Sequence, residues 1–184
     1  MSYGVIEGSM IHQAREDFMD QMLKGDYTHL LFIDEDMGFR EETLPIMLSR
    51  KYPIVGCNYR IKVPPCLFTA RTADGQSDLK TTAETTGLEE TLWMGFGFCL
   101  IERQVVEATK APRFLGGYNH TKHKYATEDA PFFLQARKLG FIPMVDQDAS
   151  KLIYHCGNWS YSWDDEIPAI KRHPIAERDR YNDE

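Results

Sequence analysis

The sequence predicts an α/β fold in which helices flank a mixed, mostly parallel sheet. Over residues 3–59, short apolar runs with strand character alternate with amphipathic helical segments, a pattern typical of parallel strands joined by helices. The apolar run 30–33 is followed at once by carboxylates, as expected for a buried strand that ends at a ligand-binding edge. The length of 184 residues suits one domain with a substantial core. The predicted architecture is therefore Rossmann-like.

The first part of the chain is expected to hold three strands and two helices. Ser9 can cap a helix that runs to about Lys24 and stops at Gly25. Pro45 falls in the first turn of the second helix, where proline is tolerated. The apolar stripe of the first helix consists of Ile11, Ala14, Phe18 and Met22. The strands are expected at 3–6, 28–33 and 53–59, and the second helix at 43–50.

The second part mixes short strands, a long loop and two further helices. Segments 66–71, 80–82 and 89–94 are rich in β-forming residues and predict a small antiparallel or mixed extension. The loop 109–126 is long for a compact domain, which is typical of functional lids. Further strands are expected at 98–101, 142–145 and 152–154, and helices at 103–108 and 127–139, the last capped by Thr127 and ended by Gly140.

One domain is expected over residues 1–157, because no repeat or linker divides this part of the chain. The remaining tail, 158–184, is expected to pack through its aromatic side chains and to fray at its end. These aromatic residues are Trp159, Tyr161 and Trp163.

Composition and charge exclude several classes of protein. A net charge of −7 argues against a general electrostatic grip on nucleic acid, although 122–124 offers a small basic groove. No apolar run approaches the length of a membrane span, and the N-terminus lacks a signal-peptide pattern. His120 and His123 lack matching cysteines and are interpreted as part of a polar loop. The cysteines at 57, 66, 99 and 156 form no C-x-x-C pair and indicate reduced core thiols of a cytoplasmic protein.

The most informative stretch is Asp34-Glu35-Asp36, directly after the apolar run 30–33. In an extended segment Asp34 and Asp36 share a face while Glu35 points away. Two carboxylates on one face repel each other unless a cation lies between them, and hard ions such as Mg²⁺ or Mn²⁺ prefer oxygen ligands. The alternative is a solvated acidic turn without a metal.

Three further groups are candidates for the same site. Glu128 and Asp129 begin a helix, where acids also occur for purely structural reasons, but a carboxylate there could accept a proton from a substrate hydroxyl. His155 ends a strand and is either a satisfied polar residue or a nitrogen ligand beside Asp36. The glycines around Phe96 indicate a β-bulge or a close approach of backbone to a ligand. In that case Trp93 would give a sugar ring a flat apolar surface.

Four blocks in this order resemble the GT-A-fold, family-2-like glycosyltransferases, particularly the short forms in phage and bacterial genomes. The blocks are THLLFIDEDMGF, MGFGFCLIERQVVE, TEDAPFFLQARKLGF and YHCG, and the resemblance covers about residues 3–157. It implies sugar transfer from a nucleotide-sugar donor, such as a UDP- or GDP-sugar, helped by Mn²⁺ or Mg²⁺. Family members usually begin with one more strand and helix, about 35 residues, so the resemblance implies an N-terminally shortened form.

The resemblance also implies roles for individual residues. Asp34 and Asp36 match the D-x-D motif, with Asp36 on the metal, Asp34 at the ribose or donor sugar, and His155 as a further metal ligand. Asp129 matches the general base of inverting members, and Glu128 would touch the acceptor. The residues implied in donor or acceptor binding are Glu7, Arg15, Gly95, Phe96 and Gly97.

The expected reaction is a single inverting displacement by an acceptor hydroxyl, with the loop 109–126 closing over the donor. Retaining chemistry stays open, because the stereochemistry depends on geometry that residue spacing does not give. The acceptor stays open between a saccharide, a protein, a lipid carrier and a modified DNA base. Two alternatives also stay open. One is a non-catalytic remnant of the fold that acts as a binding or assembly module. The other is a metal-dependent nucleotidyl or phosphoryl transferase. The sequence contains no Gly-rich loop with a lysine that would support this second alternative.

Overall fold

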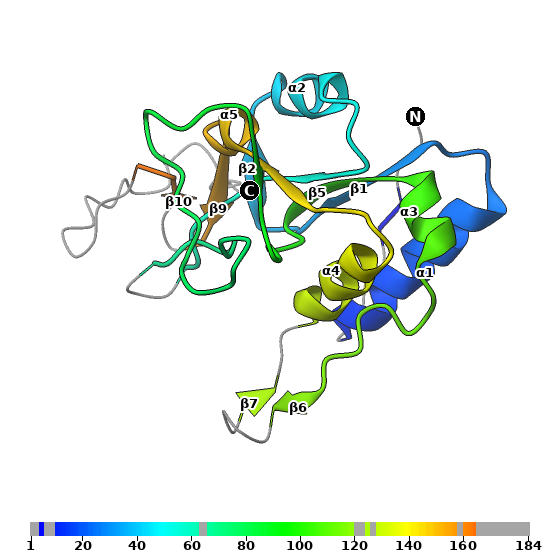
Figure 1. Cartoon of the computed structure of the whole chain (residues 1–184). Helices are drawn as coiled ribbons and strands as arrows, with labels where there is room; N and C mark the ends of the chain where they lie inside the picture. The colour runs from blue at the N-terminus through cyan, green and yellow to red at the C-terminus, as the bar shows by residue number, and fades with distance from the viewer. Residues whose placement is uncertain are drawn as a thin grey trace, which may run out of the picture.

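The computed structural model describes residues 4–5, 10–62, 66–119, 124–125, 128–157 and 160–164. Its centre is a five-stranded sheet with the strand order β1-β5-β3-β8-β4, seen along its edge in Figure 1. The chain is an α/β protein, as predicted, and four of these five strands coincide with predicted strands. The strands are β1 (His29–Ile33), β3 (Ile54–Gly56), β4 (Leu88–Glu90), β5 (Phe98–Glu102) and β8 (Met144–Asp146).

The sheet is mixed, as predicted, but mostly antiparallel where a mostly parallel sheet was expected. Strands β1 and β3 run in the same direction, as their strand-helix-strand connection predicts. However, β5 lies between them and pairs antiparallel with both. In the described part of this sheet the parallel pair is β3–β8, while β4 is antiparallel to β8. The expectation of mostly parallel strands was wrong because β5 comes from much later in the chain, and no local sequence pattern reveals that it inserts between β1 and β3.

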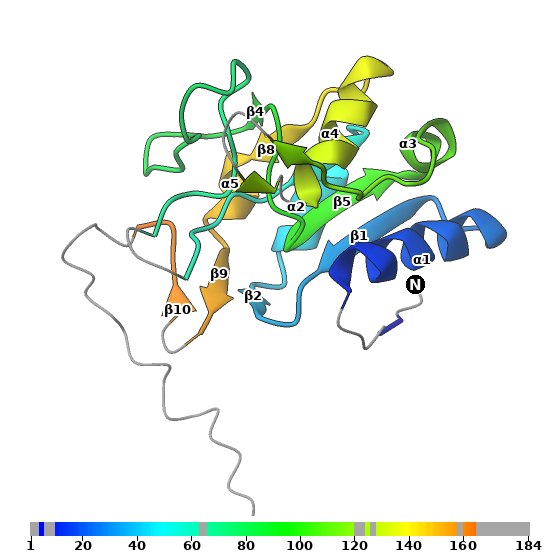
Figure 2. The same ribbon diagram turned by 90° about the horizontal axis from the view of Figure 1, so that it is seen from below.

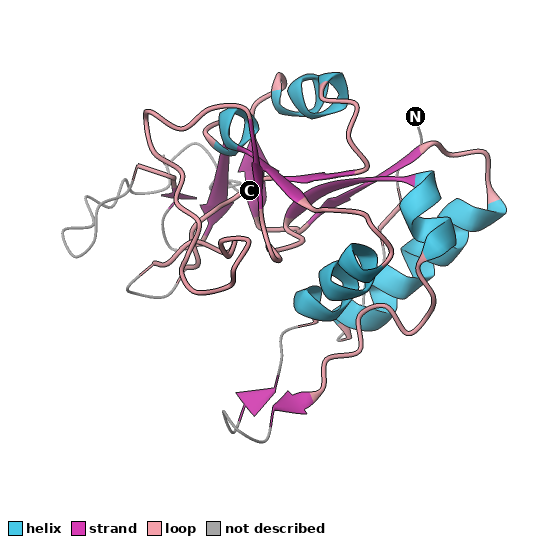
Figure 3. Ribbon diagram, viewed as in Figure 1, coloured by secondary structure: helices cyan, strands magenta, loops and turns pink. Residues whose placement is uncertain are grey.

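Helices cover both faces of the sheet (Figures 1 and 3). One core lies under α1 (Ile11–Lys24), α3 (Arg103–Ala108) and α4 (Asp129–Lys138), and the other under α2 (Thr43–Ser49) and α5 (Gln147–Ser150). Side-chain alternation along the strands divides the two cores, so that Ile54 of β3 belongs to the first and Val55 to the second. Among the described segments, no helix has the length and apolar character that crossing a bilayer requires.

Helix α1 ends at Gly25, as predicted, but its buried face differs from the predicted stripe. The buried residues are Arg15, Met19 and Met22, which recur at helical spacing, whereas Ile11 is exposed. Only 3% of the Arg15 surface is exposed, which apolar periodicity alone does not predict. The acids that surround its guanidinium, described below, explain this burial.

A second, three-stranded sheet lies beside the first and has the order β10-β9-β2 (Figure 2). It consists of β2 (Met37–Phe39), β9 (Ile153–Cys156) and β10 (Ser160–Tyr161). No strand was expected at residues 37–39, but they pair antiparallel with β9 and so extend the chain directly after the acidic stretch. The expected loop 109–126 also contains paired backbone. Its strands, β6 (Tyr118–Asn119) and β7 (Lys124–Tyr125), project from the body of the molecule in Figure 1.

Several smaller expectations had different outcomes. The segment 80–82 is not a strand; Thr81 is buried there, and its hydroxyl donates to the side chain of Gln147. The segments 66–71 and 89–94 contribute isolated bridges and part of β4. Helix α5 was not predicted, although Asp146 caps it by accepting from two backbone N–H groups. Of the expected strand 3–6, only residues 4–5 are described, and neither is in a strand. Ser9 and Thr127 lie outside the described residues.

The described part of the tail packs on the body. Tyr161 is buried, and β10 pairs with β9. The ammonium of Lys151 lies 5.9 Å from the ring centre of Trp163, whose carbonyl accepts from Arg60. Trp159 and residues 165–184 lie outside the described part, so the boundary between domain and tail at 157 stays a prediction.

Candidate functional site

The acidic stretch 34–36 is fixed from both sides by backbone hydrogen bonds. The Asp34 N–H donates to the carbonyl of Gly97 at 3.0 Å, and the Asp36 carbonyl accepts from the N–H of Cys156 at 2.6 Å. The Met37 N–H closes the turn onto the Asp34 carbonyl at 3.0 Å. Because Asp34 and Asp36 are two positions apart, their Cα atoms lie within about 7 Å of each other. The stretch therefore joins two groups of charged side chains, one around each aspartate.

The first group surrounds Asp36. Its Oδ2 atom lies 3.2 Å from Nε2 of His155 and also contacts the ammonium of Lys62. The other ring nitrogen of His155, Nδ1, lies 2.9 Å from the carbonyl of Arg60, which can only accept, so Nδ1 carries the proton. Nε2 is then left to face Asp36, which is the arrangement that orients a metal-binding histidine in many proteins.

The charge of Asp36 is favoured in this setting. Partial burial raises the pKa of its carboxyl, but the hydrogen bond and charge of Lys62, together with the neighbouring His155, outweigh burial, and the net effect lowers the pKa. Asp36 is therefore ionised across the physiological range. A carboxylate oxygen and an imidazole nitrogen at one point suit a divalent cation that takes its other ligands from water and phosphate.

The predicted metal set is only partly brought together. Asp36 and His155 converge, but Asp34 turns to Arg15 on the other side of the stretch. Within the described ranges, no group of three or more His, Cys, Asp or Glu side chains is arranged to hold a metal. Two protein ligands fit an ion such as Mg²⁺ or Mn²⁺ that takes its remaining ligands from water and, once a substrate is bound, from phosphate oxygens.

The second group is organised by Arg15 of α1. Its guanidinium contacts Asp129, lies 3.4 Å from an oxygen of Glu128 and lies 3.5 Å from an oxygen of Asp34. The sequence predicted all four residues as site residues, and the structure brings them together from three distant segments. The guanidinium also lies over the ring of Phe96, 4.9 Å from its centre. A cation below three carboxylates offsets the repulsion that would otherwise drive them apart.

Asp129 has the properties of a proton acceptor that works near neutral pH. Burial raises the pKa of its carboxyl to about 6; the charges of Glu128 and Asp34 add to the effect, while Arg15 opposes it. A general base is most effective when its pKa lies near the working pH. Glu128 stands just before the helix, and its side chain is one-third exposed.

The segment 95–97 packs against Tyr59. A β-carbon at either Gly95 or Gly97 would overlap the Tyr59 hydroxyl, and this hydroxyl accepts from the Gly97 N–H at 2.9 Å. Glycine is therefore required at both positions because the Tyr59 side chain approaches the backbone so closely. Phe96 is fully buried and reaches the site through Arg15, while Trp93 is partly buried against the core. Roles for these residues in donor binding stay predictions, and Glu7 lies outside the described residues.

Two residues of the site were not found from the sequence. Lys62 and Tyr59 belong to no motif, and each reaches the site through contacts with residues far away in the chain. A surface depression elsewhere is lined by Thr28, His29, Glu102, Arg103 and Gln104. It lies at the end of β1 opposite to Asp34 and contains none of the predicted site residues, so it is not part of the candidate site.

Comparisons with known proteins give a fold but no family. No protein-family model matches the chain, and no curated protein matches it. The crystal structure of A197 from STIV is similar, with a TM-score of 0.58 and 22% identity over 90% of this chain and 82% of that chain. A similarity at this level of identity shows that the two chains share an α/β fold.

Proposed function

We propose that the protein is a metal-dependent glycosyltransferase that moves a sugar from a nucleotide-sugar donor to an acceptor hydroxyl. The observation that carries the proposal is the pair of charged groups joined by residues 34–36. One group suits a cation with its diphosphate, and the other holds a largely buried carboxyl whose pKa burial raises to about 6. Sugar transfer requires both functions: stabilisation of the leaving diphosphate, and removal of the proton from the acceptor hydroxyl.

In the proposed reaction, Asp129 accepts the proton of the acceptor hydroxyl as the hydroxyl oxygen forms a bond to the anomeric carbon. The bond from that carbon to the donor diphosphate breaks, and the nucleoside diphosphate leaves with the electron pair. Arg15 holds Asp129 and Asp34 in place, so the base is oriented before substrate arrives. Displacement from one face makes the reaction inverting.

Asp36 and His155 would hold the cation, which when bound supplies Lewis-acid stabilisation of the diphosphate. The Arg60 carbonyl fixes the tautomer of His155 that leaves Nε2 available. UDP- and GDP-sugars are the proposed donors. We place the enzyme in the cytoplasm, which agrees with the burial of the Cys57 and Cys99 thiols.

The proposal is tested with Asp36→Ala, Asp129→Asn and the control Glu41→Gln, which changes an exposed acid near the start of α2. Donor turnover is followed as release of nucleoside diphosphate from a panel of nucleotide sugars with Mn²⁺. Asp36→Ala should abolish metal-dependent turnover. Asp129→Asn should bind the donor normally but lose transfer by a factor of 100 or more, on the order expected for a general base. Glu41→Gln should match the unchanged protein.

Full activity in both site variants would refute the assignment of roles. A protein that binds no nucleotide and turns over no donor would instead support the non-catalytic remnant. Release of pyrophosphate in place of a nucleoside diphosphate would support the nucleotidyl transferase.

A further inference from the structure

Lys62 is the one residue in the Asp36 group for which the proposed reaction gives no role. Its ammonium contacts Oδ2 of Asp36, the same oxygen that lies 3.2 Å from Nε2 of His155. A divalent cation held by Asp36 and His155 would need that oxygen as a ligand. The ammonium and the metal would therefore compete for one position, because two cations at a single oxygen repel each other.

Backbone pairing of the preceding residues positions Lys62 near Asp36. The preceding residues are tied to the segment after 65, through the Arg60–Phe68 bridge and a hydrogen bond of 2.9 Å from the Ile61 N–H to the Leu67 carbonyl. The Arg60 carbonyl also accepts from Nδ1 of His155. The segment 60–62 therefore both orients the His155 imidazole and positions the Lys62 ammonium, so that both groups contact Asp36.

The stem of Lys62 runs along the end of β9. A β-carbon at Gly157 would lie 2.7 Å from Cδ of Lys62, so glycine leaves room for the stem. One-third of the Lys62 side chain is exposed, and about the same share of Asp36. A flexible four-carbon stem with this exposure can turn its ammonium away from Asp36 while the backbone stays in place.

We propose that Lys62 is an exchangeable counter-ion of the diphosphate site, which pairs with Asp36 in the free protein and with the donor diphosphate once a divalent cation has taken Asp36. This inference rests on the proposed function. An ammonium is a good point-charge partner for phosphate oxygens. By moving from carboxylate to diphosphate, Lys62 keeps a positive charge at the leaving group and adds to the charge of the metal.

The exchange predicts opposite effects on two ligands. Without Lys62, Mn²⁺ need not displace an ammonium, so Lys62→Met should bind Mn²⁺ alone about fivefold or more tightly, as expected for a partly exposed ion pair of about 1 kcal/mol. The same variant should bind UDP or GDP at saturating Mn²⁺ about tenfold more weakly, because a charged partner of the diphosphate is lost. Lys62→Arg should keep nucleotide affinity within a few-fold.

The experiment is calorimetric titration of the full chain with Mn²⁺ alone, then with UDP and with GDP at saturating Mn²⁺. Lys24→Met, which removes an exposed lysine from the end of α1, is the matched control and should leave both affinities unchanged. Lys62→Gln repeats the test with a polar side chain, so a folding defect in one variant does not decide the result. Thermal melts establish that each variant is folded.

Three outcomes distinguish a failure of the Lys62 exchange from a failure of the proposed function. Tighter Mn²⁺ binding with weaker nucleotide binding supports the exchange. If the unchanged protein binds both ligands but Lys62→Met and Lys62→Gln bind Mn²⁺ no more tightly, the exchange is overturned while the proposed function stands. If the unchanged protein binds neither Mn²⁺ nor nucleotide, the proposed function fails, and the role of Lys62 fails with it.

Discussion

Arg15 is the side chain on which the arrangement of the acids depends. It is buried against Phe96 and Phe114, with its guanidinium 4.9 and 6.0 Å from the two ring centres. Burial of a charged group is unfavourable unless the group is paired, and here Asp34, Glu128 and Asp129 provide the pairing. Removing the arginine would leave the largely buried Asp129 beside two partly exposed like charges, which we expect to lower the free energy of unfolding, as denaturant titration would measure.

The pKa of Asp129 gives a prediction about pH. The carboxyl must be ionised to accept a proton, so kcat/KM should rise with pH and reach half its maximum near pH 6, the pKa to which burial raises this group. Because Arg15 favours the charged form, Arg15→Met should move the midpoint upward by about one pH unit or more. Activity measured from pH 5 to pH 9 gives both midpoints.

The matched control for this measurement is Arg137→Met. Arg137 lies on the same helix as Asp129 but pairs with Glu90, outside the site. Its loss should leave the midpoint near pH 6. A midpoint in Arg15→Met equal to that of the unchanged protein would show that Arg15 does not tune the base, even if the variant were less stable.

The pairing of β2 with β9 is what brings Asp36 to His155. Gly38 stands opposite Tyr154 in this pairing, and a β-carbon at Gly38 would overlap the Tyr154 ring. Gly38→Ala should therefore push the strands apart and weaken Mn²⁺ binding about tenfold, since the two ligands would lose their alignment. Calorimetric titration with Mn²⁺ measures the effect.

A second change distinguishes crowding from other effects of the alanine. Tyr154→Ser removes the ring, so the double variant Gly38→Ala with Tyr154→Ser should recover most of the affinity. Gly117→Ala, at a position where a β-carbon would meet nothing within 4 Å, should have no effect. Failure of the double variant to recover would mean that the ring does not set the strand spacing.

The strands and helices that could be predicted are those with a local signal. Strand β1 and helices α1 and α4 were predicted because an apolar run, an apolar periodicity and a glycine stop mark them. Strand β2 was missed because its three residues contain a glycine, and only pairing with β9 makes them extended. Helix α5 was also missed, because four residues are too few for a periodic pattern.

The candidate site shows the same limit. Its carboxylates and His155 were predicted because they follow predicted elements in a family-like order. Lys62 was not, because its contact with Asp36 spans 26 positions in the chain and follows no motif. The sequence also did not reveal the direction of Asp34. The spacing of the two aspartates favoured a shared cation, and the family resemblance placed Asp34 at the ribose or donor sugar, but neither predicted a pairing with Arg15. In the fold, Arg15 draws Asp34 to the other group.

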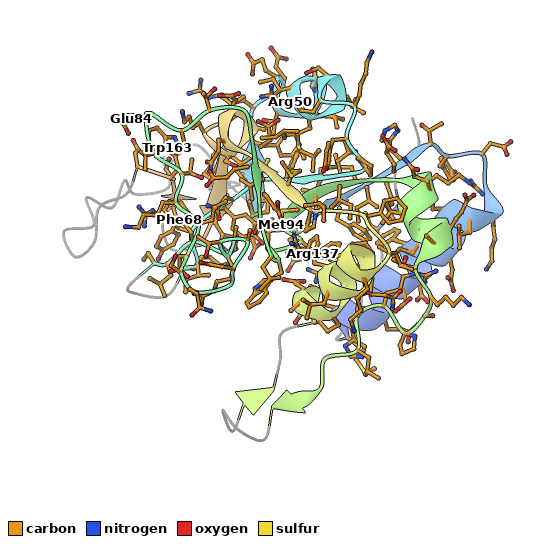
Figure 4. All side chains as sticks on the ribbon, viewed as in Figure 1. Arg50, Phe68, Glu84, Met94, Arg137 and Trp163 are labelled. Carbon is orange, nitrogen blue, oxygen red and sulfur yellow. The ribbon has the colours of Figure 1, made fainter. Side chains whose placement is uncertain are left out.

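The fold as a whole holds the two charged groups of the site on either side of β1. Helices α1 and α4 carry Arg15 and Asp129 on one face of the sheet, and β9 carries His155 beside the other face. Arg50, labelled in Figure 4, follows the end of α2 and donates at 2.8 Å to the fully buried Asp146, which ends β8 and caps α5. This ion pair fixes α5, and with it the position from which β9 starts.

Because a donor would contact groups from several segments, its binding should stabilise the entire chain. A nucleoside diphosphate with Mn²⁺ at 100 times its Kd adds about 2.7 kcal/mol to the free energy of unfolding. For a chain of this length, each kcal/mol raises Tm by about 2–4 °C, so we expect UDP or GDP with Mn²⁺ to raise Tm by about 5–10 °C. Asp36→Ala should lose most of this shift, whereas Glu41→Gln should keep it. Equal Tm values with and without the ligands would favour the non-catalytic remnant, in which the acids pair with Arg15 and Lys62 but bind no donor.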